Sequence, residues 1–535
     1  MTDVQKELIE LLKEVDDICR KYGIEYYLGG GCLIGAVRHG CFLPWDDDVD
    51  IHMSRENLCK FLDAVEKEKP ANRMIQWPTI GNNMNAHWRY KRTDNTYLMR
   101  SNIGTDAVEG QFVDIFVTYP MPLNPAKRDR CVSDFKLFLE LNAKNVILDS
   151  LRDTSYLRQY YAARACAKLL GTDRVIHYLE KRIFNFPQEG ASEWLIRSPL
   201  PPKFVVPKEW WGKPRYVDFE TMQFPIPEFA EKILCHEYGP CWFEVPNYEE
   251  RGKHVFGIDL DLPYTLYTSD YEKHINVEEF YQHQVKKKEY WFKLLWNRNI
   301  VMPHIRKLQG LSVSLEIQEK VEKNGIDLKS MVEQEEEEEL KQLFAPYFLK
   351  IQSEPYRYYG VYVDMPDDYL YAAFYFQCFN GSYGMARKVL GLRRKEESRE
   401  LSPELQRLCA LCDATDELLA LLYGDFNMAE ARTQVDKWLE KEPNALYFLR
   451  ADLYLRLNGY GSESTKELLQ RTDRYLERYP GDAELLKYRG DLLIRSGEIL
   501  DGEKCYYRAL CGLRNGFCIK SIKEYFAAKD LGAAR

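Results

Sequence analysis

The sequence lacks a strongly basic block, and its 74 lysines and arginines are outnumbered by 83 aspartates and glutamates, giving a formal net charge of −9. Non-specific nucleic-acid binding depends on a basic surface, so we expect no nucleic-acid partner. The sequence also lacks the run of about 18 apolar residues that would span a bilayer. It begins with an amphipathic helical pattern and shows no signal peptide. We therefore expect a cytoplasmic protein, able at most to attach peripherally at the inner face of a membrane.

The chain of 535 residues contains 14 cysteines, but they lack the regular paired spacing of a disulfide framework or a zinc site. The one close pair, Cys409 and Cys412, has no second pair to complete a zinc site and lies in a leucine-rich stretch. Buried thiols in a reducing compartment are the simplest interpretation. The composition, 45% hydrophobic and 29% charged, is typical of a soluble globular protein, and the length suggests about three domains.

Residue types that phosphate chemistry needs follow one another between positions 28 and 51. The segment LGGGCLIGAVRH starts at Leu28, and PWDDDVDI starts at Pro44. Small residues let a backbone approach a ligand closely, an Arg–His pair can meet negative charge, and carboxylates can hold a divalent cation. The candidate residues are Gly30, Gly31, Arg38, His39, Asp48 and Asp50.

The two aspartates are the most specific part of this pattern. If Asp48–Ile51 is a strand, Asp48 and Asp50 lie on one face, about 7 Å apart, and can share or bracket metal ions. A short helix from Leu33 to His39 would direct its first backbone amides to the same place. A solvated acidic turn is the alternative interpretation. The neighbouring strand and glycine turn favour the metal site.

Two further segments carry charge inside apparent strands. Alternation in HWRYKR, residues 87–92, places Arg89 and Lys91 on one side, where they could meet nucleotide phosphates or form an exposed basic strand edge. In FVDIFV, residues 112–117, a lone Asp114 would be costly to bury unless it is paired or bound to a metal.

The motifs GG, LIGAVRH and PWDDDVDI resemble the LicD family of phosphocholine transferases, relatives of the fukutin-related sugar-phosphate transferases. The resemblance resumes at YVDFE, residues 216–220, and covers roughly residues 1 to 260. It implies the nucleotidyltransferase fold, an α/β (α+β) mixed sheet with flanking helices. It also implies that Asp114 lies beside the first two aspartates, as a third metal ligand or as the base near the acceptor hydroxyl.

The family resemblance implies a metal-dependent transferase that uses Mg²⁺, or Mn²⁺ in its place. The donor would be CDP-choline or a related CDP-alcohol, and the acceptor a cell-surface glycan or its lipid-linked precursor. A quaternary ammonium is recognised largely by aromatic faces; the aromatic candidates are Trp45, Trp88, Tyr90, Trp210, Trp211 and Trp242. Two alternatives stay open: a nucleotidyltransferase acting on a small molecule, and a non-catalytic scaffold.

Beyond the family segment the patterns predict helices. We expect a catalytic domain at residues 1–265 and helical repeats at 401–535. Between them we expect a helical extension and connector at 266–400, with a long helix near 277–302 and no assigned fold for residues 310–400. In the last part, Leu486, Gly490, Gly502, Tyr506 and Ala509 fit the small-and-large pattern of a tetratricopeptide repeat. Such repeats usually hold a protein partner. A plain helical bundle is the alternative.

Overall fold

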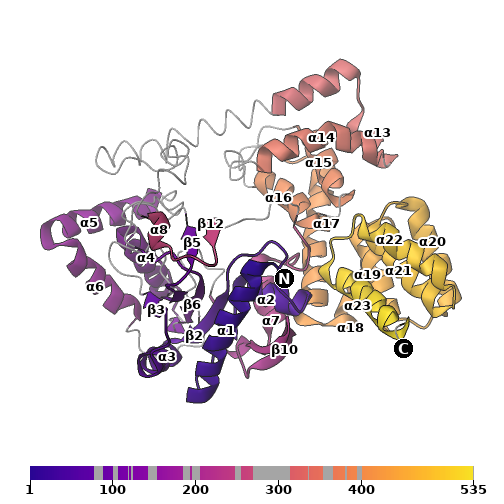
Figure 1. The fold of residues 1–535 in the computed structure, drawn as a ribbon. Coiled ribbons are helices and arrows are strands. Elements are labelled where there is room, and N and C mark those ends of the chain that lie inside the picture. The colour runs from indigo at the N-terminus through magenta and orange to yellow at the C-terminus, as the bar shows by residue number, and fades with distance from the viewer. Residues whose placement is uncertain are drawn as a thin grey trace. The chain divides into compact units, whose positions relative to one another are not determined.

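The chain forms two compact units in a computed structural model (Figure 1). Unit 1 contains residues 1–237 and 252–299, and unit 2 contains residues 238–251 and 300–535. The structure describes residues 1–76, 88–99, 107–118, 120–121, 124–142, 154–184, 193–194, 205–246, 255–268, 314–334, 336–352, 366–379, 382–394 and 400–533. The helix expected near 277–302 lies outside these residues. The three-domain division stays a prediction.

A five-stranded mixed sheet is the centre of unit 1, in the order β1-β2-β6-β4-β3. Strands β2 and β6 are parallel, and the other neighbours are antiparallel. The nucleotidyltransferase-like mixed sheet with flanking helices is therefore confirmed. Its strands are β1 (Tyr27–Leu28), β2 (Asp50–Ser54), β3 (Arg73–Gln76), β4 (Trp88–Arg92) and β6 (Phe112–Thr118).

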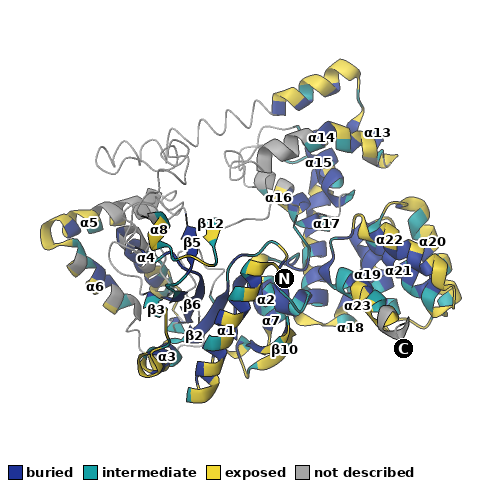
Figure 2. Ribbon diagram, in the orientation of Figure 1, coloured by how far each residue is buried: buried dark blue, intermediate teal, exposed yellow. Residues whose placement is uncertain are grey.

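One face of this sheet packs against α1 (Asp3–Tyr22) and α3 (Arg55–Glu68). Both helices begin where capping residues satisfy their first amides: Thr2 forms a capping box with Gln5, and Ser54 caps α3. Alternate strand residues point to this side, so β2 contributes Ile51 and Met53, both almost fully buried. Figure 2 shows buried and exposed residues alternating along α1, as expected for a helix with one side on a sheet. This face is the apolar core, which leaves the other face for chemistry.

The remaining described elements of unit 1 surround the sheet. Helix α2 (Gly30–Arg38) connects β1 to the acidic loop, and β5 pairs with β12. Strands β10 and β11 form a hairpin that contacts α2 and β1. The bounds are β5 Thr96–Met99, β7 Pro120–Met121, α4 Pro125–Asn142, α5 Thr154–Leu170, α6 Thr172–Phe184, β8 Glu193–Trp194, β9 Val206–Pro207, η4 Lys208–Trp210, β10 Arg215–Phe219, β11 Met222–Ile226, α7 Ala230–Tyr238, β12 Val255–Asp259 and α8 Thr265–Thr268.

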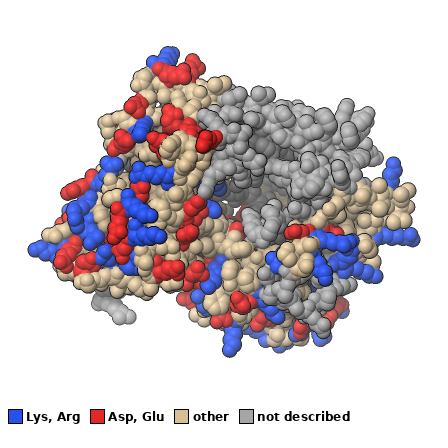
Figure 3. Space-filling model, turned by 180° about the vertical axis from the view of Figure 1, so that it is seen from behind, with Lys and Arg blue, Asp and Glu red and all other residues tan. Residues whose placement is uncertain are grey.

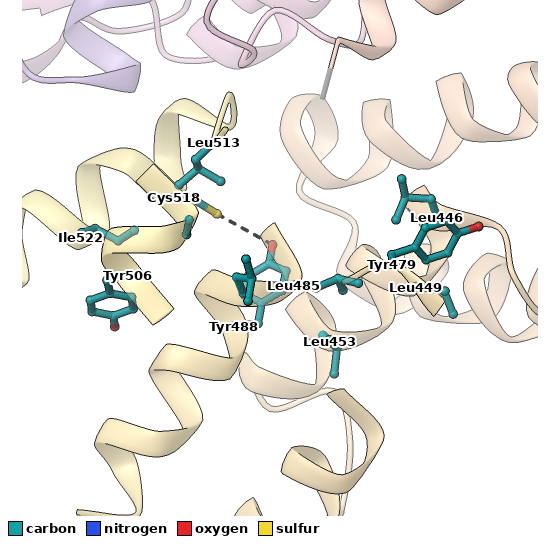
Figure 4. Close-up of a cluster of buried hydrophobic side chains, with 12 residues drawn as sticks. Leu446, Leu449, Leu453, Tyr479, Leu485, Tyr488, Tyr506, Leu513, Cys518 and Ile522 are labelled. Carbon is teal, nitrogen blue, oxygen red and sulfur yellow. Dashed lines mark hydrogen bonds between the residues drawn. The ribbon is translucent and has the colours of Figure 1, made fainter. Parts of the chain in front are cut away.

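Unit 2 is helical throughout its named elements, as the sequence predicted for residues 401–535; the sequence did not assign a fold to residues 310–400. They are α13 Leu328–Glu333, α14 Glu337–Gln352, α15 Asp367–Phe379, α16 Tyr383–Arg394, α17 Pro403–Ala420 with a π-helical turn Leu421–Asp425, α18 Met428–Lys441, α19 Leu446–Leu457, α20 Thr465–Arg478, α21 Ala483–Arg495, α22 Ile499–Leu510 and α23 Gly516–Ala533. Buried leucine and tyrosine side chains of α19, α21 and α22 form a common core with Cys518 and Ile522 of α23 (Figure 4).

The small residues of the predicted repeat pattern lie where α21 and α22 meet. A Cβ on Gly490 would lie 2.7 Å from the Tyr506 ring and 3.0 Å from the carbonyl oxygen of Gly502. These glycines therefore permit the close approach of the two helices. The identification of the pairs as tetratricopeptide repeats, and a protein partner bound by them, stay predictions.

The segment 238–246, which we call the strap, follows α7 in the sequence but belongs to unit 2. Its backbone forms a β-bridge between Glu244 and Asn515. Phe243 stacks on Tyr423 at a centroid distance of 3.9 Å, and Trp242 meets the Phe517 ring edge-on at 5.6 Å. Part of the segment that resembles the LicD family is therefore built into the helical unit.

Glu244 of the strap caps α16, because its carboxylate accepts hydrogen bonds from the backbone N–H groups of Tyr383 and Gly384 at 3.1 and 3.0 Å. Burial raises the pKa of Glu244 from its ordinary value of 4.5 to about 7. Folding therefore favours the protonated carboxyl, and its contribution to stability is complete below pH 4.5 and is lost as the pH rises through about 7.

We expect Glu244→Gln to flatten the pH dependence of stability between pH 4.5 and 7.5, since the shift corresponds to about 3 kcal/mol in the wild type. Urea midpoints measured across this range check the prediction. The exposed Glu477→Gln on α20 is the matched control and should keep the wild-type slope. Equal slopes in Glu244→Gln and wild type would contradict it.

Two general properties follow from the described residues. No helix among them is both long and apolar enough to cross a membrane. All 14 cysteines are free thiols, and Cys409 and Cys412 are buried in α17. Figure 3 shows basic and acidic side chains interspersed over most of the described surface on one face.

Candidate active site

The glycine turn leads straight into α2, which begins at Gly30 and not at Leu33 as expected. Gly29 is the N-cap residue, and its N–H donates to the carbonyl oxygen of Asp50 at 2.9 Å, joining the turn to β2. Gly30 has φ +52°, a conformation that glycine adopts without strain. The turn therefore holds the first residues of α2 beside the start of the acidic strand.

Three carboxylates meet on the second face of the sheet. Asp50 opens β2 and pairs in register with Asp114 on the parallel strand β6, while Asp48 lies just before β2. One ligand oxygen from each of the three lies within 4.8 Å of the others. The predicted neighbourhood of Asp114 is therefore observed. The strand is shorter than expected, since β2 begins at Asp50 and Asp48 lies in the loop before it.

Arg89 holds Asp114 in place. The two residues are directly paired across β4 and β6, and Arg89 Nε donates to Asp114 Oδ1 at 2.6 Å. Both side chains are almost fully buried, with exposed fractions of 2% and 7%. The alternative of an exposed basic strand edge is wrong, because β4 lies between β6 and β3. Arg89 contacts a candidate metal ligand, whereas its predicted contact with nucleotide phosphates stays a prediction.

Lys91 shares this face but is fully buried. Its ammonium donates to the carbonyl oxygen of Val108 and lies 5.3 Å from the centre of the Phe112 ring. Burial, with the nearby charge of Arg89, lowers the pKa of Lys91 to about 7. Lys91 is therefore a buried residue on the same face of the sheet as the carboxylates. Its predicted role in nucleotide binding stays a prediction.

Arg38 and His39 end α2 and contact each other. Arg38 is buried, its Nε donates to His39 Nε2 at 2.9 Å, and burial lowers its pKa to about 10, with Asp46 opposing the shift. Asp46 in turn explains Gly31, since a Cβ there would lie 2.2 Å from Asp46 Oδ2. Gly31 thus allows a carboxylate, in this structure, to approach α2 closely. Phosphate contacts of Gly30, Gly31, Arg38 and His39 stay predictions.

Aromatic rings lie on the same face as the carboxylates, where Trp211, a candidate from the sequence, meets His52, Phe116 and Tyr27, which the sequence did not predict. His52 follows Asp50 by two residues on β2, and its ring lies 5.6 Å from Phe116 and 5.3 Å from Trp211. Tyr27, paired with His52 across β1 and β2, also packs on Trp211 at 5.3 Å. Period-two alternation of β2 and β6 could have indicated His52 and Phe116, but Trp211 comes from a distant segment.

The aromatic candidates from the sequence are thus separated. Trp211 packs beside the carboxylate face. Trp88 and Tyr90 pair with Ile115 and Val113 and belong to the apolar core on the opposite face. Trp242 belongs to the strap in unit 2.

Close contact between Gly29 and His52 gives a testable prediction. A Cβ on Gly29 would lie 2.4 Å from His52 Cδ2, although the backbone at Gly29 suits any residue. We expect Gly29→Ala to destabilise the protein by about 1–3 kcal/mol through overpacking. The double variant Gly29→Ala/His52→Ala should recover most of the loss relative to His52→Ala alone. Urea denaturation measures all four proteins, and strictly additive effects would contradict a steric cause.

Comparison with known proteins shows which family the segment around this site is similar to. The family profile described as "LicD/FKTN/FKRP, nucleotidyltransferase domain" matches residues 23–131, the segment that supplies all three carboxylates. Residues 23–131 of unit 1 are therefore similar to the LicD/FKTN/FKRP nucleotidyltransferase domain.

Similar individual proteins agree with this. Over 273 residues the chain is 25% identical to the lipopolysaccharide cholinephosphotransferase LicD of Haemophilus influenzae, covering 48% of this chain and 96% of that protein. Over 63 residues it is 38% identical to the ribitol 5-phosphate transferases FKRP of Mus musculus and Homo sapiens, covering 11% of this chain and 13% of each relative. These LicD-family relatives are named as transferases of substituted phosphate groups.

Proposed function

We propose that this protein transfers a phosphoalcohol, phosphocholine in the first instance, from a CDP-activated donor to a hydroxyl of a cell-surface glycan or its lipid-linked precursor. The observation that carries the proposal is the meeting of Asp48, Asp50 and Asp114 within the segment that is similar to the LicD family. Similarity to a cholinephosphotransferase over 96% of its length supports phosphocholine. The shorter similarity to ribitol 5-phosphate transferases keeps ribitol phosphate as a second donor group to test.

The three carboxylates fit a magnesium site. Their donor atoms are all oxygens and lie within 4.8 Å of one another, and Mg²⁺ prefers a few carboxylates together with substrate phosphates. When bound, Mg²⁺, or Mn²⁺ in its place, would neutralise the diphosphate and acidify the acceptor hydroxyl. Arg89 fixes the orientation of the Asp114 carboxylate, so that this ligand is preorganised by a neighbouring strand.

The proposed reaction is a displacement at phosphorus. The acceptor hydroxyl oxygen attacks the phosphorus that carries the alcohol, a new P–O bond forms, and the bond to the bridging oxygen breaks, releasing CMP. The hydroxyl proton leaves to a base or to water. Asp114 can act there only if its carboxylate is not committed to Arg89 and the metal, so we assign it a ligand role.

A panel of CDP-alcohols tests the proposal. Purified protein is incubated with Mg²⁺, a glycan acceptor and CDP-choline, CDP-ethanolamine or CDP-ribitol, and the products are analysed by mass spectrometry. We expect CMP release together with a phosphoalcohol added to the glycan, strongest with CDP-choline. Release of pyrophosphate from CTP and a phosphoalcohol would instead indicate a nucleotidyltransferase. Failure to turn over any donor, with or without Mg²⁺ or Mn²⁺, would refute the transferase.

A further inference from the structure

Unit 2 contains a cavity that the proposed transfer reaction does not use. Its volume is about 390 Å³, within the range of small-molecule sites. The side chains that line it and carry the argument are Tyr423, Tyr454, Lys487, Asp491, Arg495 and Phe517. All of them lie in unit 2.

One wall of the cavity is a row of charges along α21. Lys487, Asp491 and Arg495 are four residues apart, so they share one side of the helix. Lys487 Nζ contacts Asp491 Oδ2 at 2.7 Å, and this pair is largely buried. Arg495 lies at the exposed end of the row, where its Nη1 lies 3.4 Å from the carbonyl oxygen of Leu457. The row therefore carries one net positive charge, which favours an anionic group at the Arg495 end.

The facing wall is aromatic. Tyr423 and Phe517 stack with a centroid distance of 5.7 Å and an interplanar angle of 3°, and Tyr454 lies 6.1 Å from Tyr423. The Tyr506 hydroxyl donates to Asp491 Oδ1 at 2.6 Å, so this ring is fixed against the charged wall. Tyr488, which lies beside Cys518 in Figure 4, completes the floor. Aromatic faces suit a cation that cannot donate hydrogen bonds.

We propose that this cavity binds phosphocholine, with the quaternary ammonium against the aromatic rings and the phosphate at Arg495. The choice of ligand rests on the proposed function, whereas the two-ended chemistry of the cavity is independent of it. A zwitterion matches both sides of the cavity, because the rings bind its cationic end and the exposed Arg495 binds its phosphate. Unit 2 would thereby recognise the group that unit 1 transfers.

The rings of the cavity also contact the strap. Tyr423 and Phe517 line the cavity; Tyr423 stacks on Phe243 of the strap, and Phe517 meets Trp242 of the strap edge-on. A ligand in contact with these two rings is therefore in contact with the side chains against which the strap packs. The strap is continuous in sequence with α7. This gives the site a packed connection to the strap, within unit 2.

The test measures phosphocholine binding to the full chain by calorimetry, with EDTA present and in the Asp50→Asn background so that the metal site is silent. We expect Arg495→Gln to weaken binding about tenfold, Arg495→Lys to keep it within about threefold, and Tyr454→Leu to weaken it about tenfold. Arg474→Gln on α20, exposed and outside the cavity, is the matched control and should bind like its parent.

Choline and inorganic phosphate are the two comparison probes, and each should bind at least about tenfold more weakly than phosphocholine because it satisfies one wall only. Equal binding of inorganic phosphate and phosphocholine would overturn the proposal, as would no binding or no effect of Arg495→Gln. Turnover of CDP-alcohols by the wild type is recorded separately. Binding without turnover would refute the transferase and support the phosphocholine site. Turnover without binding would support the transferase and refute the phosphocholine site.

Discussion

Replacing Asp50 with asparagine is expected to lower CDP-alcohol turnover by about a thousandfold or more, with the protein still folded. Asp50 is the first residue of β2 and pairs in register with Asp114 on the neighbouring strand β6. The sheet therefore holds the two residues side by side. An asparagine has nearly the same shape but no charge to offset a divalent cation. Initial rates over a series of Mg²⁺ concentrations measure the effect, and circular dichroism checks the fold.

The exposed Asp63 on α3 supplies the matched control, since Asp63→Asn makes the same chemical change outside the site. Its turnover should stay within about twofold of the wild type, as usual for surface changes away from special features. Asp48→Asn and Asp114→Asn should resemble Asp50→Asn, because all three carboxylates contribute to one cluster. Turnover of Asp50→Asn near the wild-type rate would show that the cluster does not hold a catalytic ion.

The carboxylate cluster was predictable because its signals are local. Asp48 and Asp50 stand in one short motif, and an aspartate inside the apolar strand of Asp114 needs a partner wherever that strand lies. The parallel pairing of β2 and β6 then follows from the fold that the LicD resemblance implied. The helix caps at Thr2 and Ser54 were predictable for the same reason, because a capping side chain bonds to a backbone N–H only three residues later in the sequence.

What the sequence did not predict depends on contacts between distant segments. Arg89 was expected to meet a ligand, but its first partner is Asp114, 25 residues away. Gly31 was assigned to phosphate approach, whereas the group that needs its space is the Asp46 carboxylate. The strap, whose sequence resembles the catalytic family, packs among the helices of unit 2. Periodicity determines which face a residue occupies and leaves its partner to tertiary packing.

Arg450→Met is expected to destabilise unit 2 by about 3–5 kcal/mol, since it removes one member of a buried ion network. Arg450 of α19 is 6% exposed, and its Nη2 lies 2.5 Å from Asp482 Oδ2. A second contact reaches Glu484 at 3.5 Å, and the guanidinium lies 4.6 Å from the centre of the Tyr447 ring. The substitution would leave two largely buried carboxylates without this cation, and urea denaturation measures the loss.

A triple variant separates the loss of the ion pairs from the loss of the side-chain volume. Asp482 also caps α21 by accepting from the N–H of Leu485 at 2.9 Å, so a serine there keeps the cap and removes the charge. Arg450→Met/Asp482→Ser/Glu484→Gln should therefore recover most of the stability, because no unpaired buried charge of the network remains. The exposed Arg474→Gln should stay within about 0.5 kcal/mol of the wild type. If the triple variant were as unstable as Arg450→Met, the arginine would act through its packing on Tyr447, and the charge network would not be what joins α19 to the start of α21.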